Sequence, residues 1–130
     1  MQQETNMPIR LEWRRFPDFI VARIAMRRQP CIYLQTDAEE KILRVGQSDD
    51  LWNRYFGGTA YTVAAAMHNS GNLFFVAPVP TEPNDRKRVE ATLIYELKPP
   101  YNKQGKNLPP TLRAQCLHAG EIPRCLQCAV

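Results

Sequence analysis

The sequence predicts a single α+β domain built on a small three-stranded antiparallel sheet flanked by helices. Two short runs of β-forming residues are separated by a polar stretch, which is the pattern of a hairpin. A third such run lies between Gly71 and Pro80. Helical spacing of apolar residues precedes the hairpin and follows the third run. The expected order is therefore a helix, two strands, one or two helices, a strand, a long helix and a tail.

The first expected helix begins near Pro17, whose fixed backbone angle suits a first helical turn. Apolar residues follow at helical spacing, among them Phe19 and Ile24, and Pro30 ends the segment. The chain before this helix starts with polar residues. We therefore expect residues 1–16 to form an N-terminal extension.

The hairpin is expected from strands at 31–36 and 41–47, joined by a roughly four-residue loop. With that loop, Tyr33 lies opposite Arg44, and the two share one face of the hairpin. A register shift of two residues would keep this division of faces, whereas a shift of one would bury Arg44. The simplest interpretation of the pair is a cross-strand contact on a solvated face. The opposite, core-facing side then holds Ile32, Leu34, Leu43 and Val45.

Two helical segments and a strand should follow the hairpin. Ser48 or Asp49 is a suitable cap for a short helix that reaches Phe56, where a glycine pair ends it. A second helical piece is expected between Thr62 and His68. The third strand is expected at 73–79.

The long helix, capped by Asn84 or Asp85 and ending at Leu97, carries a carboxylate on its apolar face. Glu90 falls in the arc of the buried stripe, where a charge is costly unless it is paired or binds a cation. An Arg86–Glu90 ion pair and a metal site both remain open interpretations. The adjacent run Arg86-Lys87-Arg88 would attract phosphates or form a solvated basic face.

Length and composition limit the class of protein. The chain has 130 residues, 44% of them hydrophobic, which suits one compact domain. No apolar run reaches the length of a membrane span, and the N-terminus lacks a signal-peptide core, so a cytoplasmic protein without a membrane partner is expected. The formal net charge of +4 permits a polyanionic partner but does not require one.

Cysteines gather at the C-terminal end, in residues 105–130, which we expect to be a tail with one helical turn near Leu112. Two interpretations are open for this cluster: a structural Cys₃His zinc site, or reduced thiols on a flexible tail. The spacing of the first pair is unusual for zinc, so we favour the thiols. The candidate zinc ligands are Cys116, His118, Cys125 and Cys128.

Five segments in order resemble the GIY-YIG nuclease superfamily. Individually they are unspecific, but together they cover roughly residues 17–103, and the implied domain is 17–104. The first two stand where the family has Gly-Ile-Tyr and Tyr-Ile-Gly. In chain order the segments are Cys31-Ile32-Tyr33, Arg44-Val45-Gly46, Ser48 to Arg54, Glu90-Ala91-Thr92-Leu93-Ile94 and Pro100-Tyr101-Asn102.

The resemblance implies a metal-dependent endonuclease that hydrolyses DNA, with RNA not excluded. It implies that Tyr33 activates or holds the attacking water, and that Arg54 binds the scissile phosphate. Glu90 would be the sole protein ligand of Mg²⁺ or Mn²⁺, and Asn102 would support the site by hydrogen bonding. We expect the nucleic-acid contacts to come from Arg86, Lys87, Arg88 and Lys103.

Arg44 is the main departure from the family pattern, because a tyrosine normally stands there. A guanidinium beside Tyr33 would favour its phenolate and hold a phosphate oxygen. Some restriction-enzyme members of the family are similar in having a basic residue at this position. Our hypothesis is that Arg44 maintains activity. The competing hypotheses are a catalytically degenerate domain that binds nucleic acid or protein, and an interaction domain with a fortuitous likeness. A homodimer or a partner protein would supply targeting, since the chain shows no separate targeting domain.

Overall fold

The computed structural model describes residues 8–54, 73–79, 82–102, 106, 110 and 113–127. The helical piece expected between Thr62 and His68 and the turn expected near Leu112 lie outside these ranges. The described elements are β1 (Ile9–Phe16), α1 (Phe19–Ala25), β2 (Cys31–Thr36), β3 (Ile42–Ser48), α2 (Leu51–Arg54), β4 (Leu73–Pro78), α3 (Pro83–Leu97), β5 (Cys116–Gly120) and α4 (Arg124–Gln127).

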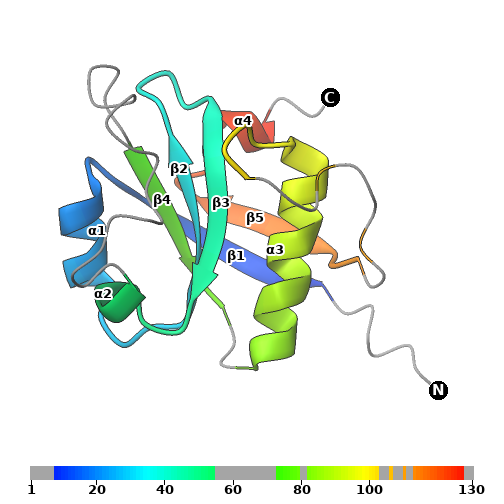
Figure 1. Cartoon of the computed structure of the whole chain (residues 1–130), viewed down its shortest axis with the longest axis horizontal. Helices are drawn as coiled ribbons and strands as arrows, with labels where there is room; N and C mark the ends of the chain where they lie inside the picture. The colour runs from blue at the N-terminus through cyan, green and yellow to red at the C-terminus, as the bar shows by residue number, and fades with distance from the viewer. Residues whose placement is uncertain are drawn as a thin grey trace.

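The strands form one mixed sheet of five strands in the order β3-β2-β4-β1-β5. The pairs β3–β2, β2–β4 and β4–β1 are antiparallel, whereas β1 and β5 run parallel. The helices α1 and α2 lie on one side of the sheet, and α3 lies on the other (Figure 1). The α+β class is confirmed. The expected three strands are present as β3-β2-β4, and the sheet is larger because β1 and β5 extend it.

β1 corrects the expectation that residues 1–16 form an extension outside the domain. From Ile9 onward these residues alternate between buried and exposed positions, as a strand with one face in the core does. Leu11 and Trp13 are almost completely buried. β1 also lies between β4 and β5, so it is an interior strand of the sheet.

The hairpin strands are confirmed, but their register differs by two residues from the expected one. Tyr33 pairs with Gly46, and Gln35 pairs with Arg44. The pairing shifts between Gln35 and Thr36, and the loop residue Glu40 adopts a left-handed conformation with φ 66°. Because the shift is an even number of residues, Tyr33 and Arg44 still share a face.

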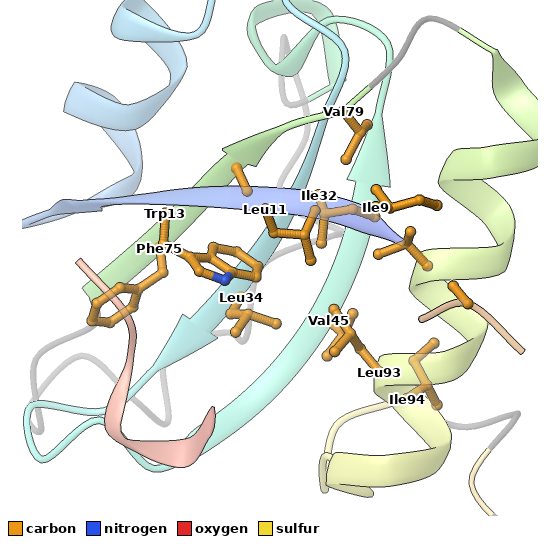
Figure 2. Close-up of a cluster of buried hydrophobic side chains, with 13 residues drawn as sticks. Ile9, Leu11, Trp13, Ile32, Leu34, Val45, Phe75, Val79, Leu93 and Ile94 are labelled. Carbon is orange, nitrogen blue, oxygen red and sulfur yellow. The ribbon is translucent and has the colours of Figure 1, made fainter. Parts of the chain in front are cut away.

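Both faces of β2 are buried, and this corrects the interpretation of its second face as solvated. The expected core face packs against α3, where Ile32, Leu34 and Val45 meet Leu93 and Ile94 (Figure 2). A second core lies under α1 and α2 on the opposite face. Its buried members are Phe16, Ala22, Met26, Cys31, Tyr33, Leu51, Phe74 and Val76.

The helices α1 and α3 begin in different ways. α1 begins after Pro17, and Asp18 caps it by accepting a hydrogen bond from the Val21 amide at 2.9 Å. α3 begins with Pro83 at its first position, preceded by Glu82, which makes no side-chain capping bond. The expected cap at Asn84 or Asp85 is therefore wrong, because Pro83 starts the helix earlier.

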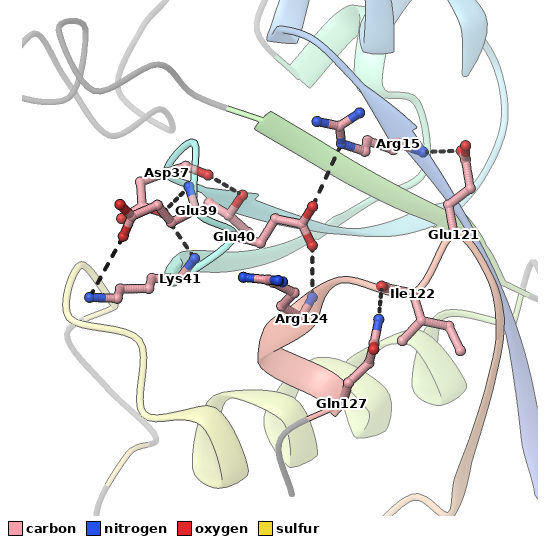
Figure 3. Close-up of polar contacts among 10 residues, drawn as sticks. Arg15, Asp37, Glu39, Glu40, Lys41, Glu121, Ile122, Arg124 and Gln127 are labelled. Carbon is pink, nitrogen blue, oxygen red and sulfur yellow. Dashed lines mark hydrogen bonds and ion pairs between the residues drawn. The ribbon is translucent and has the colours of Figure 1, made fainter.

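The C-terminal segment, expected to be a tail, completes the sheet domain. β5 pairs with β1, and the Glu121 amide donates to the Trp13 carbonyl at 2.9 Å. Polar contacts then tie this segment to the hairpin loop (Figure 3). The Glu40 carboxylate accepts a hydrogen bond from the Arg124 amide at 2.9 Å, and the Glu121 carboxylate accepts one from the Arg15 amide at 2.7 Å.

Candidate functional site

Tyr33 and Arg44 are joined by a hydrogen bond on the sheet face that carries α1 and α2. The Arg44 guanidinium donates from Nη1 to the Tyr33 hydroxyl oxygen at 2.9 Å. Tyr33 is completely buried, whereas Arg44 is half-buried. Since Arg44 pairs with Gln35 in the ladder, the contact runs diagonally across the two strands. The pair expected from the hairpin pattern is therefore present.

Gly46 makes room for the Tyr33 ring. A Cβ atom at this position would lie 2.3 Å from both Cζ and Oη of Tyr33. Such a distance is far inside van der Waals contact, and the ring is fully buried among packed side chains. The residue opposite Tyr33 must therefore be a glycine for the phenol ring to lie above β3.

Asn102 closes the outer edge of β3 beside Arg44. Its side-chain oxygen accepts a hydrogen bond from the Val45 amide at 2.8 Å, and its Nδ2 donates to the Val45 carbonyl at 3.0 Å. The Tyr101 amide also donates to the Leu43 carbonyl at 3.0 Å. An asparagine side chain thus pairs with the edge strand as a backbone amide would.

α2 follows the hairpin directly and brings Arg54 to the same side of the sheet. Ser48 Oγ accepts a hydrogen bond from the Asp50 amide at 3.1 Å, and Asp50 Oδ1 accepts one from the Trp52 amide at 3.1 Å. These two side chains end β3 and start the helix. Arg54 is the last residue of α2, and its side chain lies outside the described residues.

Glu90 is half-buried on α3 at the margin of the buried stripe formed by Val89, Leu93 and Ile94. That stripe packs on the sheet face opposite the one that carries Tyr33 and Arg44. The structure therefore unites Tyr33, Arg44, Gly46 and Asn102 around β3, and the helix of Glu90 approaches β3 from the other face.

The basic run on α3 has three different environments. Arg86 is buried and donates from Nε to Gln47 Oε1 at 3.1 Å, so the interpretation of a solvated basic face is wrong for this residue. Arg88 forms an ion pair with Asp85 at 3.0 Å, and Lys87 is exposed. Lys103 lies outside the described residues. Two of the three cations therefore hold the protein's own groups.

Cys31, which stands in place of the family's first glycine, is a core residue. Its side chain is fully buried among the residues under α1. Burial raises the pKa of this thiol to about 12, because the thiolate is disfavoured away from water. Cys31 therefore packs as a small apolar residue with a protonated, unreactive thiol.

The structure describes three of the four candidate zinc ligands. Cys116 and His118 lie half-buried on β5, and burial raises the pKa of the Cys116 thiol to about 11. Trp13 Nε1 donates to His118 Nδ1 at 3.0 Å, so Nε2 carries the ring proton and neither nitrogen offers zinc a lone pair. No group of three His, Cys, Asp or Glu side chains suited to a metal occurs within the described part of the chain. Cys128 lies outside that part.

Sequence reasoning missed a cluster of arginines and tryptophan between α1 and α2. The guanidinium carbons of Arg23 and Arg27 lie 4.2 Å and 4.7 Å from the centroid of a Trp52 ring. The signal in the sequence was the spacing of Arg23 and Arg27, four residues apart, which would place both on one face of a helix that continued to Arg27. Their convergence on Trp52 depends on the tertiary packing of α1 against α2.

The comparisons with known proteins add no relative. No protein-family model, no curated protein and no solved structure matches the chain. Among the residues that the structure describes, no helix has both the length and the apolar character needed to cross a membrane.

Proposed function

We propose that the chain is a metal-dependent endonuclease that hydrolyses DNA phosphodiester bonds at a GIY-YIG-type site in which Arg44 replaces the second tyrosine. The hydrogen bond between Arg44 Nη1 and Tyr33 Oη is the observation that carries the proposal. A guanidinium carries several N–H donors in one fixed plane, and this geometry suits phosphate oxygens. Arg44 would hold the Tyr33 hydroxyl in place as the group that activates water and would stabilise charge on the phosphate.

The other roles are divided between helices. Arg54, at the end of α2, would bind the scissile phosphate on the same side of the sheet. Glu90 is a half-buried carboxylate, and a hard divalent cation that keeps most of its waters needs only one such protein ligand. Glu90 would hold Mg²⁺ or Mn²⁺, which would supply Lewis-acid stabilisation of the phosphate when bound. Because α3 and Tyr33 lie on opposite faces of the sheet, the metal and Tyr33 would act on one phosphate at the edge strand β3.

One observation favours a second candidate, a catalytically degenerate domain that binds nucleic acid. Tyr33 has an exposed fraction of 0%, and α3 packs on the opposite face of the sheet. A buried phenol reaches water only if the surrounding side chains move. In that case Tyr33, Arg44 and Gly46 would serve to hold the hairpin, and the surface around them would bind without cutting.

Cleavage of supercoiled plasmid in the presence of Mg²⁺ or Mn²⁺ tests the enzyme. We expect Glu90→Ala and Tyr33→Phe each to reduce nicking by about 100-fold or more, because each removes a group that acts on the reacting atoms. Tyr33→Phe keeps the ring above Gly46, so its effect reports the hydroxyl. Matched controls are Glu96→Ala and Tyr95→Phe on α3, which should cut like the wild type. Absence of nicking by the wild-type chain would contradict the proposal.

Arg44→Tyr distinguishes the two candidates directly. If Arg44 takes over the role of the second tyrosine, the wild type nicks plasmid and the Arg44→Tyr variant nicks it at a similar or lower rate. If the wild type binds DNA without cutting and Arg44→Tyr creates metal-dependent nicking, the degenerate domain is correct. Measuring plasmid nicking and binding for both proteins separates these outcomes.

A further inference from the structure

Two arginines share one tryptophan on the side of the sheet that carries Tyr33. Arg23 lies on α1 and Arg27 lies in the turn that follows this helix, and both guanidinium groups stack against Trp52 of α2. Arg23 also donates from Nη2 to the Trp52 carbonyl at 2.6 Å, and its guanidinium carbon lies 5.5 Å from the Phe19 ring centroid. We call the group of Arg23, Arg27 and Trp52 the arginine–tryptophan surface.

The charges of this surface are not paired with a carboxylate in the described part of the chain. Elsewhere on the described part of the chain, arginines form ion pairs with carboxylates, as Arg88 does with Asp85 and Arg113 with Glu96. Among the residues that the structure describes, no carboxylate forms an ion pair with Arg23 or Arg27. Like charges held against the same ring repel each other. A bound polyanion would relieve this repulsion.

The stacked geometry suits phosphate groups. The exposed Arg27 guanidinium lies against the indole, and its N–H edge can donate two parallel hydrogen bonds to a phosphate. Arg23 adds charge beside it, because its own Nε is buried and its Nη2 donates to the Trp52 carbonyl. α2, which carries Trp52, ends two residues later at Arg54. Arg14 lies on the same sheet face, exposed, with its guanidinium 5.0 Å from the Phe16 ring centroid. A strand bound at Arg44 and Arg54 would therefore continue over cationic residues.

We propose that the arginine–tryptophan surface binds the phosphates of nucleic acid that flank the site at Tyr33 and Arg44. The inference deepens the proposed function and takes from it only the choice of nucleic acid as the partner. It also moves the binding surface from α3, where Arg86 and Arg88 hold the protein's own groups, to α1 and α2. The contacts contribute affinity, and the cutting step belongs to other residues.

The main competitor is a protein partner. Ile20 and Ile24 are 63% and 58% exposed on α1, and an acidic amphipathic peptide would use such apolar side chains together with the arginines. Nucleic acid is favoured because the exposed Arg27 guanidinium matches phosphate and because the surface is continuous with α2. An acidic peptide is therefore included as a probe.

Binding of the full chain to a short fluorescent DNA duplex, measured in EDTA over a range of salt concentrations, tests the inference. We expect Arg27→Gln to weaken binding several-fold at low salt and to reduce the slope of log K against log salt by about 0.9, and Arg14→Gln/Arg27→Gln to reduce it by about 1.8. Arg27 and Arg14 are exposed, so both changes leave the core intact. The matched control is Arg113→Gln, whose guanidinium also stacks on an aromatic ring but pairs with Glu96.

The inference would be overturned by no binding of duplex by the wild-type chain, by unchanged binding by the Arg27 variant, or by an equal loss in the Arg113 control. Binding of the acidic peptide in preference to duplex would assign the surface to a protein partner and would likewise overturn it. Because EDTA prevents metal-dependent cleavage, duplex binding is measured independently of nicking. A chain that binds through Arg27 but never nicks plasmid would refute the endonuclease and leave this surface assigned.

Discussion

At the scale of single residues, Gly46 determines where the Tyr33 ring can lie. We expect Gly46→Ala to lower the free energy of unfolding by about 1–3 kcal/mol, because the added methyl group would overlap a fully buried ring. The same displacement should break the hydrogen bond between Tyr33 and Arg44. Urea unfolding of the variant and the wild type measures the loss of stability.

A double-mutant cycle identifies the cause of that loss. In a Tyr33→Leu background the ring is absent, so Gly46→Ala should cost clearly less than it does in the wild type. An equal cost in both backgrounds would mean that the backbone of β3, and not the Tyr33 ring, requires a glycine at this position.

Asn102 offers a second test at the residue scale. Asn102→Asp keeps the shape of the side chain but replaces the donor to the Val45 carbonyl with a second acceptor. We expect the free energy of unfolding to fall by about 1–3 kcal/mol at neutral pH, because a half-buried carbonyl then faces a carboxylate oxygen. Asn84→Asp, an exposed change on α3, is the control for charge alone. Equal stability of both variants would exclude a clamp on β3.

At the scale of elements, the hydrogen bond from Trp13 to His118 makes the pairing of β1 and β5 sensitive to pH. Burial lowers the pKa of His118 below its ordinary value of about 6.5, so near that pH the unfolded chain binds more protons than the folded one. Stability is therefore full above the unfolded pKa and falls as pH is lowered towards the folded pKa. Protonated Nδ1 also cannot accept from Trp13. We expect the free energy of unfolding to decrease between about pH 7 and pH 5.

His118→Asn isolates this effect from the carboxylates that also titrate in acid. The asparagine oxygen occupies roughly the place of Nδ1 and accepts from Trp13 without titrating. Urea unfolding at both pH values should show a smaller loss for the variant than for the wild type. If the two proteins lose the same stability, His118 does not set the pH dependence.

The elements also show which parts of the fold local patterns can predict. The hairpin and α3 depend on contacts within a short stretch of chain, and both were predicted nearly to their ends. β1 was missed although residues 9–13 alternate between apolar and charged side chains, which is a recognisable strand signal. β5 is short and gains its pairing only from β1, more than one hundred residues earlier in the chain, so no local pattern indicates it.

At the scale of the whole molecule, the sequence predicted some local contacts of the candidate site but not how its residues are divided between the two faces of the sheet. Strand alternation predicted that Tyr33 and Arg44 share a face, although their hydrogen bond runs diagonally and not between directly opposed residues. The resemblance implied a supporting role for Asn102, and the structure shows its hydrogen bonds to Val45. The burial of Arg86 and the convergence of Arg23 and Arg27 on Trp52 depend on how α1, α2 and α3 pack on opposite faces of the sheet. Packing between distant segments is not encoded in any one stretch of sequence.

The sheet order makes a last prediction about the smallest unit that folds. The resemblance implies a domain of residues 17–104, but that segment lacks β1 and β5. Without them the edge of β4 and the apolar face around Phe75 and Val89, which β1 covers with Leu11 and Trp13, would be open to water. We therefore expect residues 17–104 alone to show no cooperative unfolding transition, whereas residues 8–130 unfold cooperatively. Urea denaturation followed by circular dichroism measures both, and a cooperative transition in 17–104 would show that β1 and β5 are additions to a self-sufficient nuclease-like core.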